Sequence, residues 1–162
     1  MKLPRLNWRK PTFWLILGFI GLASWGAMRD ANAADLRIGA GFGWENAQDA
    51  VSMDLMLTID EDFYLSAAKM AGGRVGDDVW RYAAGFRFDW REGKRIQPFL
   101  RLGGAYWDGI TGLVGDQHTF DLALGLRFGG ALELELQHNS TAGRSVPNTG
   151  VDLIVLGLVK EF

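Results

Sequence analysis

Cysteine is absent from this 162-residue chain, so neither a disulfide framework nor a thiolate metal site can form. A glycine-rich phosphate loop, a Walker motif and an HExxH zinc motif are absent as well. The formal net charge is −2, so the chain lacks the basic surplus of a nucleic-acid-binding protein. These absences predict a protein without a nucleic-acid partner, and nothing in the sequence calls for a metal or a cofactor.

Long apolar runs are also scarce, and the one clear example lies near the N-terminus at residues 12–28. Basic residues precede this run, namely Lys2, Arg5, Arg9 and Lys10. The sequence Ala31-Asn32-Ala33 follows it and matches an A-x-A cleavage site. We therefore predict a secretory signal peptide over residues 1–33. An uncleaved N-terminal membrane helix is the alternative, because the run is nearly long enough to span a bilayer.

Removal of residues 1–33 would leave one domain, residues 34–162, with 12 basic and 18 acidic residues and a net charge of −6. Beyond Ala34 no segment has a convincing helical period, and apolar residues recur at every second position instead. Residues 80–90 show this best. Large apolar side chains on one face (Trp80, Tyr82, Phe86, Phe88, Trp90) alternate with small or charged ones on the other (Arg81, Ala83, Gly85, Arg87, Asp89).

Eight such segments can be counted, at residues 35–44, 50–59, 62–71, 78–91, 95–107, 117–128, 131–140 and 151–162. Short connections at 60–61, 92–94 and 129–130 alternate with longer ones at 45–49, 72–77, 108–116 and 141–150. Bacterial outer-membrane barrels have short periplasmic turns and long extracellular loops. The pattern predicts an all-β fold, an eight-stranded antiparallel transmembrane β-barrel of the Gram-negative outer membrane, with both termini in the periplasm.

The assignment of the two strand faces separates this barrel from a soluble β-sandwich or lipocalin. In a soluble fold the large aromatic face would point inward, and the outer face would be rich in Gly and Ala, which is unusual for a solvated surface. In a membrane barrel the small residues leave room in a narrow lumen. Arginines would then pair there with carboxylates: Arg81, Arg87, Arg101 and Arg127 with Asp54, Asp89, Asp121, Glu133 and Glu135.

Three polar residues break the apolar pattern of the outward face near the end of the chain. Leu132, Leu134 and Leu136 should face lipid, and the same parity continues to His138 and Ser140. Pairing Leu136 with Ile154, and Leu134 with Leu156, places His138 opposite Asp152. A hydroxyl nucleophile, a base and an acid that orients the base would then share one surface, as in a hydrolase triad. Polarity at a strand end beside a loop is the simpler reading of each residue taken alone.

The run His138-Asn139-Ser140, followed by Asn148-Thr149-Gly150-Val151-Asp152, resembles the signature of the lipid A 3-O-deacylases, the PagL family. The resemblance is sharp over residues 137–152, and elsewhere it extends to architecture and size. It implies an eight-stranded barrel whose triad lies on its exterior. It also implies a serine esterase that removes an ester-linked acyl chain from lipid A, with Ser140, His138 and Asp152 as the triad.

Two positions depart from the family pattern. The acid is usually Glu, and Asp152 is one methylene shorter. Thr141 stands where the family usually has an Asn assigned to the oxyanion hole, so the Thr141 hydroxyl and the backbone N–H groups of Ala142 and Gly143 are the candidate donors. Asn148 matches the family's loop Asn, which we interpret as a loop-positioning residue.

We therefore expect a lipid A deacylase whose substrate is lipopolysaccharide of the outer leaflet. The terminal Phe162 resembles the signal that outer-membrane assembly machinery recognises, which makes this machinery a second expected partner. His118 lies at a strand end and is expected to be a solvated loop-edge residue. The alternatives are a non-catalytic small barrel, or a family member whose activity is impaired.

Overall fold

The computed structural model describes residues 34–59, 62–72, 75–90, 95–108, 116–143 and 150–162. The predicted signal peptide and Asn148 lie outside these ranges. Eight strands are present: β1 (Ala34–Trp44), β2 (Val51–Ile59), β3 (Phe63–Gly72), β4 (Gly76–Asp89), β5 (Ile96–Asp108), β6 (His118–Phe128), β7 (Leu132–Ser140) and β8 (Val151–Glu161). A short 3-10 helix, η1 (Glu45–Ala47), follows β1. No helix within the described ranges is long and apolar enough to cross a membrane.

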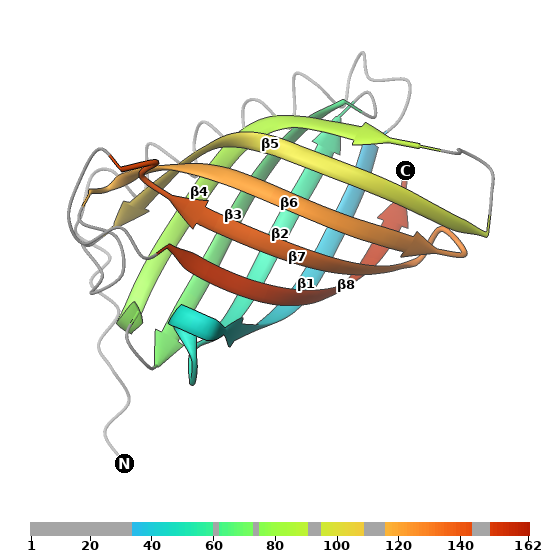
Figure 1. Ribbon diagram of the computed structural model, residues 1–162. Coiled ribbons are helices and arrows are strands. Elements are labelled where there is room, and N and C mark those ends of the chain that lie inside the picture. The colour runs from blue at the N-terminus through green and yellow to red at the C-terminus, as the bar shows by residue number, and fades with distance from the viewer. Residues whose placement is uncertain (1–33, 60–61, 73–74, 91–94, 109–115, 144–149) are drawn as a thin grey trace. The chain divides into compact units, whose positions relative to one another are not determined.

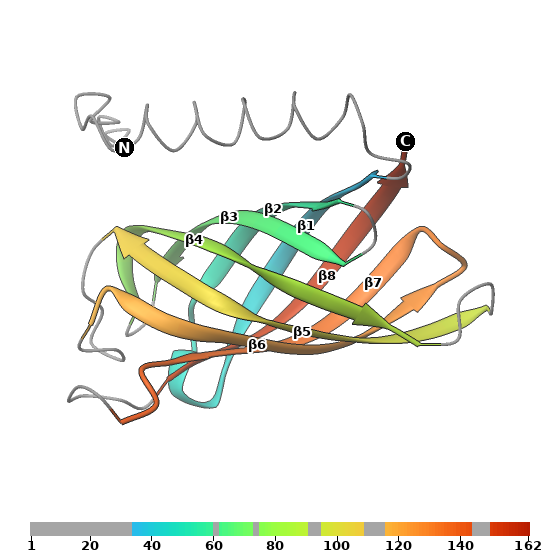
Figure 2. The same ribbon diagram turned by 90° about the horizontal axis from the view of Figure 1, so that it is seen from above.

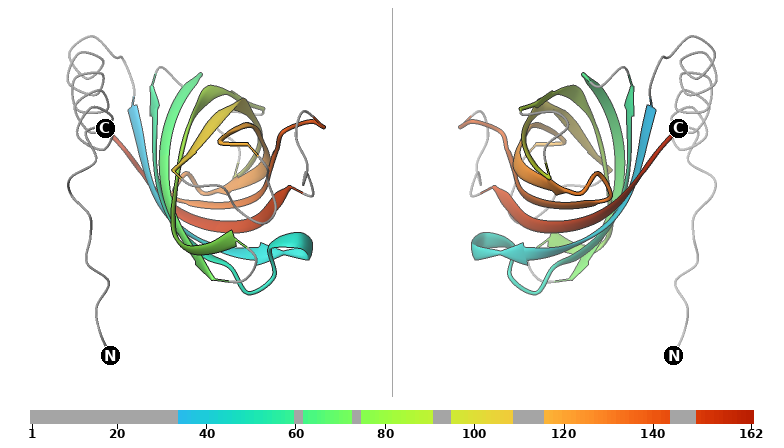
Figure 3. Two further views of the ribbon diagram at one scale, coloured as in Figure 1. Left: turned by 90° about the vertical axis from the view of Figure 1, so that its left-hand side faces the viewer. Right: turned by 90° about the vertical axis from the view of Figure 1, so that its right-hand side faces the viewer.

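The strands form a closed antiparallel barrel in sequence order, with β8 paired back onto β1 (Figures 1 and 2). Views along the barrel show the ring that the strands make (Figure 3). Every strand predicted from the period-two pattern is present, with ends within two residues of those expected. The predicted eight-stranded fold is thus confirmed. We call the end that carries the connections after β1, β3, β5 and β7 the loop end, and the opposite end the turn end.

The barrel exterior is largely apolar. On β7 and β8 the outward residues Leu134, Leu136 and Leu156 are exposed, while their neighbours along each strand are buried. The same alternation exposes Phe86 and Phe88 on β4 and Leu122, Leu124 and Leu126 on β6. A continuous apolar outer surface of this kind is typical of strands that face lipid. A soluble β-sandwich would require these large side chains to point into the interior. They point outward, so the soluble alternative is wrong.

The interior holds the predicted charge network. Arg81 pairs with Asp121 at 2.8 Å, Arg101 with Glu135 at 2.8 Å, and Arg87 with Glu133 at 2.8 Å. Arg127 also pairs with Glu133, and Arg87 with Asp89, whereas within the described ranges Asp54, the fifth predicted carboxylate, pairs with Arg37 and not with any of the four predicted arginines. Each of these charges has an opposite partner, as charges buried away from water require.

Arg37 is a member of this network that the sequence analysis did not single out. Its guanidinium is buried and contacts three carboxylates, those of Asp54, Glu133 and Glu135. It therefore links β1, β2 and β7 across the lumen. Burial of one cation among three anions makes Arg37 a central charge of the interior.

The interior also contains large side chains, which corrects the expectation of a face that is only small or charged. Tyr64, Phe99 and Trp107 are each 0% exposed. Interior glycines make room for two of them, because a Cβ on Gly125 would overlap the Phe99 ring, and a Cβ on Gly103 would overlap the Tyr64 hydroxyl. The guanidinium of Arg87 lies 4.0 Å above the Phe99 ring. Aromatic rings and paired charges together fill the space that the glycines leave.

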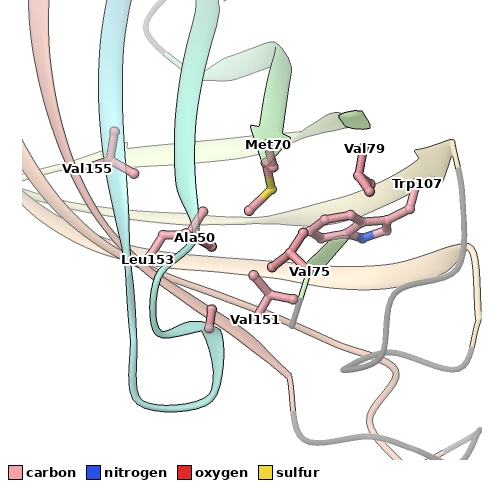
Figure 4. Packing of buried hydrophobic residues seen from close by; sticks show 9 residues of the cluster. Ala50, Met70, Val75, Val79, Trp107, Val151, Leu153 and Val155 are labelled. Atoms are coloured by element: carbon pink, nitrogen blue, oxygen red, sulfur yellow. The ribbon is translucent and has the colours of Figure 1, made fainter. Parts of the chain in front are cut away.

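A second packed region closes the loop end (Figure 4). Trp107 lies among valines there, and its indole N–H donates to the Thr119 hydroxyl at 2.9 Å. Ala47 of η1 and Ala50 belong to the same buried cluster as Val151 and Leu153 of β8. The connection between β1 and β2 is therefore packed against the beginning of β8, the strand that carries Asp152.

Candidate functional site

The pairing of β7 with β8 places His138 directly opposite Asp152. The register is the predicted one, with Leu136 opposite Ile154 and Leu134 opposite Leu156. Nδ1 of His138 lies 2.6 Å from Oδ1 of Asp152. The His138 side chain is 43% exposed and that of Asp152 is 22% exposed. The pair thus lies on the outer wall of the barrel, at its loop end.

A carboxylate on Nδ1 fixes the state of the imidazole ring. Because an ionised carboxylate can only accept, the proton of neutral His138 belongs on Nδ1, and Nε2 is left with a free lone pair. The ring can then accept a proton at Nε2. This is the arrangement of the base in a hydrolase triad.

Ser140 lies on the same outward face of β7, two residues beyond His138, and pairs with Phe120 of β6. It is partly exposed, as is His138. Both residues are described, and no hydrogen bond joins the Ser140 hydroxyl to the His138 ring. Two residues along a strand correspond to about 7 Å, so rotation of the two side chains has to bring Oγ and Nε2 together.

Gly150 lies against the His138 ring. A Cβ built on Gly150 would lie 2.6 Å from Cε1 of His138, and the φ angle of Gly150 is +79°. A residue with a side chain would therefore be strained in its backbone and would also displace the ring. The absence of a side chain at Gly150 lets the imidazole lie beside β8, within reach of Asp152.

A groove of about 230 Å³ begins at the His138–Asp152 pair and extends over the apolar wall. Its lining includes Trp44 and Glu45 on one side and Leu122, Leu124 and Leu136 along the wall. Its surroundings are therefore polar at the paired side chains and aliphatic away from them. Such a groove suits a ligand that has a polar linkage joined to a hydrocarbon chain.

The other predicted site residues occupy different environments. Thr141 is 0% exposed, so its side chain does not share the exposed surface of His138 and Ser140. Ala142 and Gly143 follow it and are exposed, with φ angles of +51° and +81°. Their backbone groups are therefore the accessible ones beside the end of β7. The described residues bring His138, Ser140 and Asp152 to one surface and leave the Thr141 hydroxyl out of it.

His118 is exposed at the beginning of β6, as expected for a loop-edge residue. Its side chain lies 3.5 Å from Asp116, and its ring lies 5.4 Å from that of Tyr106. Within the described ranges, no group of three or more His, Cys, Asp or Glu side chains could hold a metal ion.

Asn46 is a polar contact of the site that the sequence analysis missed. Its Nδ2 donates to Oδ2 of Asp152 at 3.4 Å. It approaches from η1 because β8 pairs with β1, and Trp44 lies opposite Asp152 in that pairing. The register of the β1–β8 closure is the signal that would have revealed this contact, since it places the residues just after Trp44 beside Asp152.

The fold is similar to those of solved outer-membrane barrels. The outer membrane enzyme PagL is 22% identical, with 77% of this chain and 97% of that chain covered and a TM-score of 0.53. The N-terminal β-barrel domain of Pseudomonas aeruginosa OprF is 12% identical, with 82% of this chain and 98% of that chain covered and a TM-score of 0.58. No protein-family model and no curated protein matches the sequence. At these identities the similarity establishes the fold, an eight-stranded barrel of the outer-membrane type.

Proposed function

We propose that this chain is a bacterial outer-membrane esterase that removes an ester-linked, 3-O acyl chain from lipid A. An outer-membrane location is supported by the apolar barrel exterior and by the similarity to outer-membrane barrels. With the loop end at the cell surface, the His138–Asp152 pair lies at the depth of the outer leaflet. Lipid A is the lipid of that leaflet, so substrate and site would meet without extraction of the lipid.

The 2.6 Å contact between His138 and Asp152 on the exterior wall carries this proposal. A half-exposed imidazole and a carboxylate serve no packing purpose on a surface that is largely apolar, and polar groups are unfavourable there. The neighbouring Ser140 supplies the nucleophile. The groove below the pair has the aliphatic lining that an acyl chain requires.

The reaction proceeds in two steps. The Ser140 oxygen attacks the ester carbonyl carbon while Nε2 of His138 takes the hydroxyl proton. The proton then passes to the departing sugar oxygen, which leaves as an alcohol, and the acyl group stays on Ser140. Water, deprotonated by His138, then attacks the carbonyl carbon of this acyl-enzyme. The bond between the acyl carbon and the Ser140 oxygen breaks, His138 returns its proton to that oxygen, and the fatty acid is released. Asp152 keeps the ring oriented and stabilises the imidazolium that forms in each step.

The oxyanion of each tetrahedral intermediate needs hydrogen-bond donors. Burial of Thr141 favours the backbone N–H groups of Ala142 and Gly143 over the Thr141 hydroxyl for this role. Positive φ angles at both residues give the chain a sharp change of direction beside Ser140. Ala142 adopts this conformation despite its Cβ, which is uncommon for a residue other than Gly, Asn or Asp.

A non-catalytic barrel is the second candidate. Two observations favour it: the similarity to the OprF domain is as extensive as that to PagL, and Ser140 and His138 share no hydrogen bond. In that case the loops would carry the function and lipid A would be unchanged.

Mass spectrometry of lipid A separates the two candidates. Lipid A is isolated from Gram-negative cells that express the chain, and from matched cells that express the Ser140→Ala variant. The esterase predicts loss of one hydroxyacyl chain with the wild-type protein alone. Identical spectra from the two strains, with both proteins folded in the outer membrane, would favour the non-catalytic barrel.

A further inference from the structure

We propose that Asn46 is a positioning residue of this site, which holds the Asp152 carboxylate in the orientation that His138 needs. This inference rests on the proposed esterase function and extends it to a residue of the loop between β1 and β2. Asn46 is not itself a lining residue of the groove, and it donates to Asp152, so we place its effect in the orientation of the acid.

The two oxygens of Asp152 have different partners. Oδ1 lies 2.6 Å from Nδ1 of His138, and Oδ2 accepts from Nδ2 of Asn46 at 3.4 Å. One hydrogen bond leaves a carboxylate free to turn about its Cβ–Cγ bond. A second donor on the other oxygen restricts that rotation and keeps Oδ1 aimed at the ring.

The loop that carries Asn46 is fixed at both ends. The backbone N–H of Gly43 donates to the Ala50 carbonyl at 2.8 Å, and that of Ala50 donates to the Ala47 carbonyl at 3.0 Å. Ala47 and Ala50 are buried against Val151 and Leu153, on either side of Asp152 in β8. The loop therefore makes a packed contact with the strand that bears the acid.

The backbone before Asn46 also has an unusual conformation. Glu45 has a φ angle of +49°, in the left-handed region that non-glycine residues rarely adopt. Strained positions of this kind persist where surrounding contacts enforce them, and they cluster at functional sites. Here the turn at Glu45 directs the chain so that Asn46 meets β8.

The length of the acid gives a chemical reason for this contact. Asp152 has a single methylene between its backbone and its carboxyl group. So short a side chain keeps its 2.6 Å contact with His138 only over a narrow range of torsion angles. A brace from Asn46 would hold it within that range.

Three variants test this role in detergent-solubilised, full-length protein with purified lipid A as substrate. Asn46→Leu keeps the size of the side chain and removes the donor, so kcat should fall about tenfold, with KM unchanged within about twofold. Asn46→Asp keeps size and turn preference but faces Asp152 with a second carboxylate, so its kcat should fall further. Gln48→Leu is the matched control, because Gln48 is exposed on the same loop and should keep wild-type kinetics.

A double-mutant cycle shows whether Asn46 acts through the acid. In an Asp152→Asn background, Asn46→Leu should change kcat by less than about twofold, because the two losses are not independent. An equal tenfold loss in both backgrounds would overturn the inference, since Asn46 would then affect the rate by another route.

¹⁵N NMR of the histidine rings reports which ring nitrogen carries the proton, and a change in loop stability alone would not alter that. The chain has two histidines, so ring ¹⁵N-histidine labelling gives one pair of ring signals, Nδ1 and Nε2, for each of them, and a His118→Gln variant assigns the two pairs. His138 should be protonated on Nδ1 in the wild type and should become a mixture of tautomers in Asn46→Leu, while His118 stays unchanged. Heat-modifiable migration on gels verifies that each variant is a folded barrel.

The outcomes separate this inference from the proposed function. If Ser140→Ala is inactive while both Asn46 variants keep wild-type kcat and the wild-type His138 tautomer, the esterase stands and the role of Asn46 is refuted. If Ser140→Ala is fully active, the esterase mechanism is refuted. In that event, the His138 tautomer in the wild type and in Asn46→Leu still decides whether Asn46 orders the His138–Asp152 pair: a change supports this role, and an unchanged tautomer refutes it.

Discussion

His138 and Asp152 are fourteen residues apart in the chain, yet Nδ1 of one lies 2.6 Å from Oδ1 of the other, across the β7–β8 pair on the outer wall. In an ester hydrolase of the triad type, this contact sets the tautomer and orientation of the base. In such an enzyme Ser140 would be the nucleophile, His138 the base and Asp152 the acid that orients the base, and each of these roles can be tested separately.

Replacement of the acid should be less damaging than replacement of the nucleophile. Asp152→Asn keeps the shape of the side chain and loses its charge, so the tautomer preference and the stabilisation of the imidazolium are weakened. We expect kcat for lipid A deacylation to fall steeply but to remain measurable above that of Ser140→Ala. Equal residual rates in the two variants would mean that Asp152 does more than orient the base.

The Thr141 hydroxyl should contribute little to catalysis, because Thr141 is buried away from the exposed face of Ser140. Thr141→Val is close in shape and removes only the hydroxyl. We expect its kcat to stay within about threefold of the wild type. A loss on the order of 10²-fold, the usual effect of removing an oxyanion donor, would show that the hydroxyl donates and that the backbone groups do not suffice.

Arg37 should be essential to the stability of the barrel interior, since it faces three buried carboxylates. Arg37→Met is similar in length and leaves those anions without their shared cation. Removal of one partner from a buried ion pair costs about 3–5 kcal/mol, and we expect a loss of this order in the free energy of unfolding by urea. Arg95→Met, at an exposed position beside β5, is the control and should change it by less than about 0.5 kcal/mol.

The loop end should face the cell exterior. The chain has no cysteine, so single cysteines can be introduced without background labelling. Gln48→Cys on the β1–β2 loop should react with a membrane-impermeant thiol reagent in intact cells, and Ala131→Cys at the turn end should react only after lysis. The reverse pattern would place His138 and Asp152 in the inner leaflet, away from lipid A.

The strands and their faces could be predicted from the sequence because a barrel strand repeats every two residues. Leu132, Leu134 and Leu136 fixed the parity of β7, and pairing with Leu156 then brought His138 opposite Asp152. β8 was harder, because both of its faces are apolar. Burial of Val151 and Leu153 beside the exposed Leu156 settles which face is inside.

Contacts that depend on closure of the barrel could not be predicted in this way. The β1–β8 register joins the two ends of the domain, and local periodicity on either strand leaves that register open. It determines that Trp44 lies opposite Asp152, and therefore that Asn46 can reach the acid. The place of Arg37 among carboxylates of β2 and β7 likewise depends on which side chains meet across the lumen.

The most direct test of Ser140 as the nucleophile is to compare deacylation of purified lipid A by the wild type and by the Ser140→Ala variant. Wild-type protein and the variant are purified as folded barrels, incubated with lipid A in detergent micelles, and the released fatty acid is measured. We expect release of one hydroxy fatty acid per lipid A by the wild type and none above background by Ser140→Ala. Equal release by both proteins would contradict the assignment of Ser140 as the nucleophile.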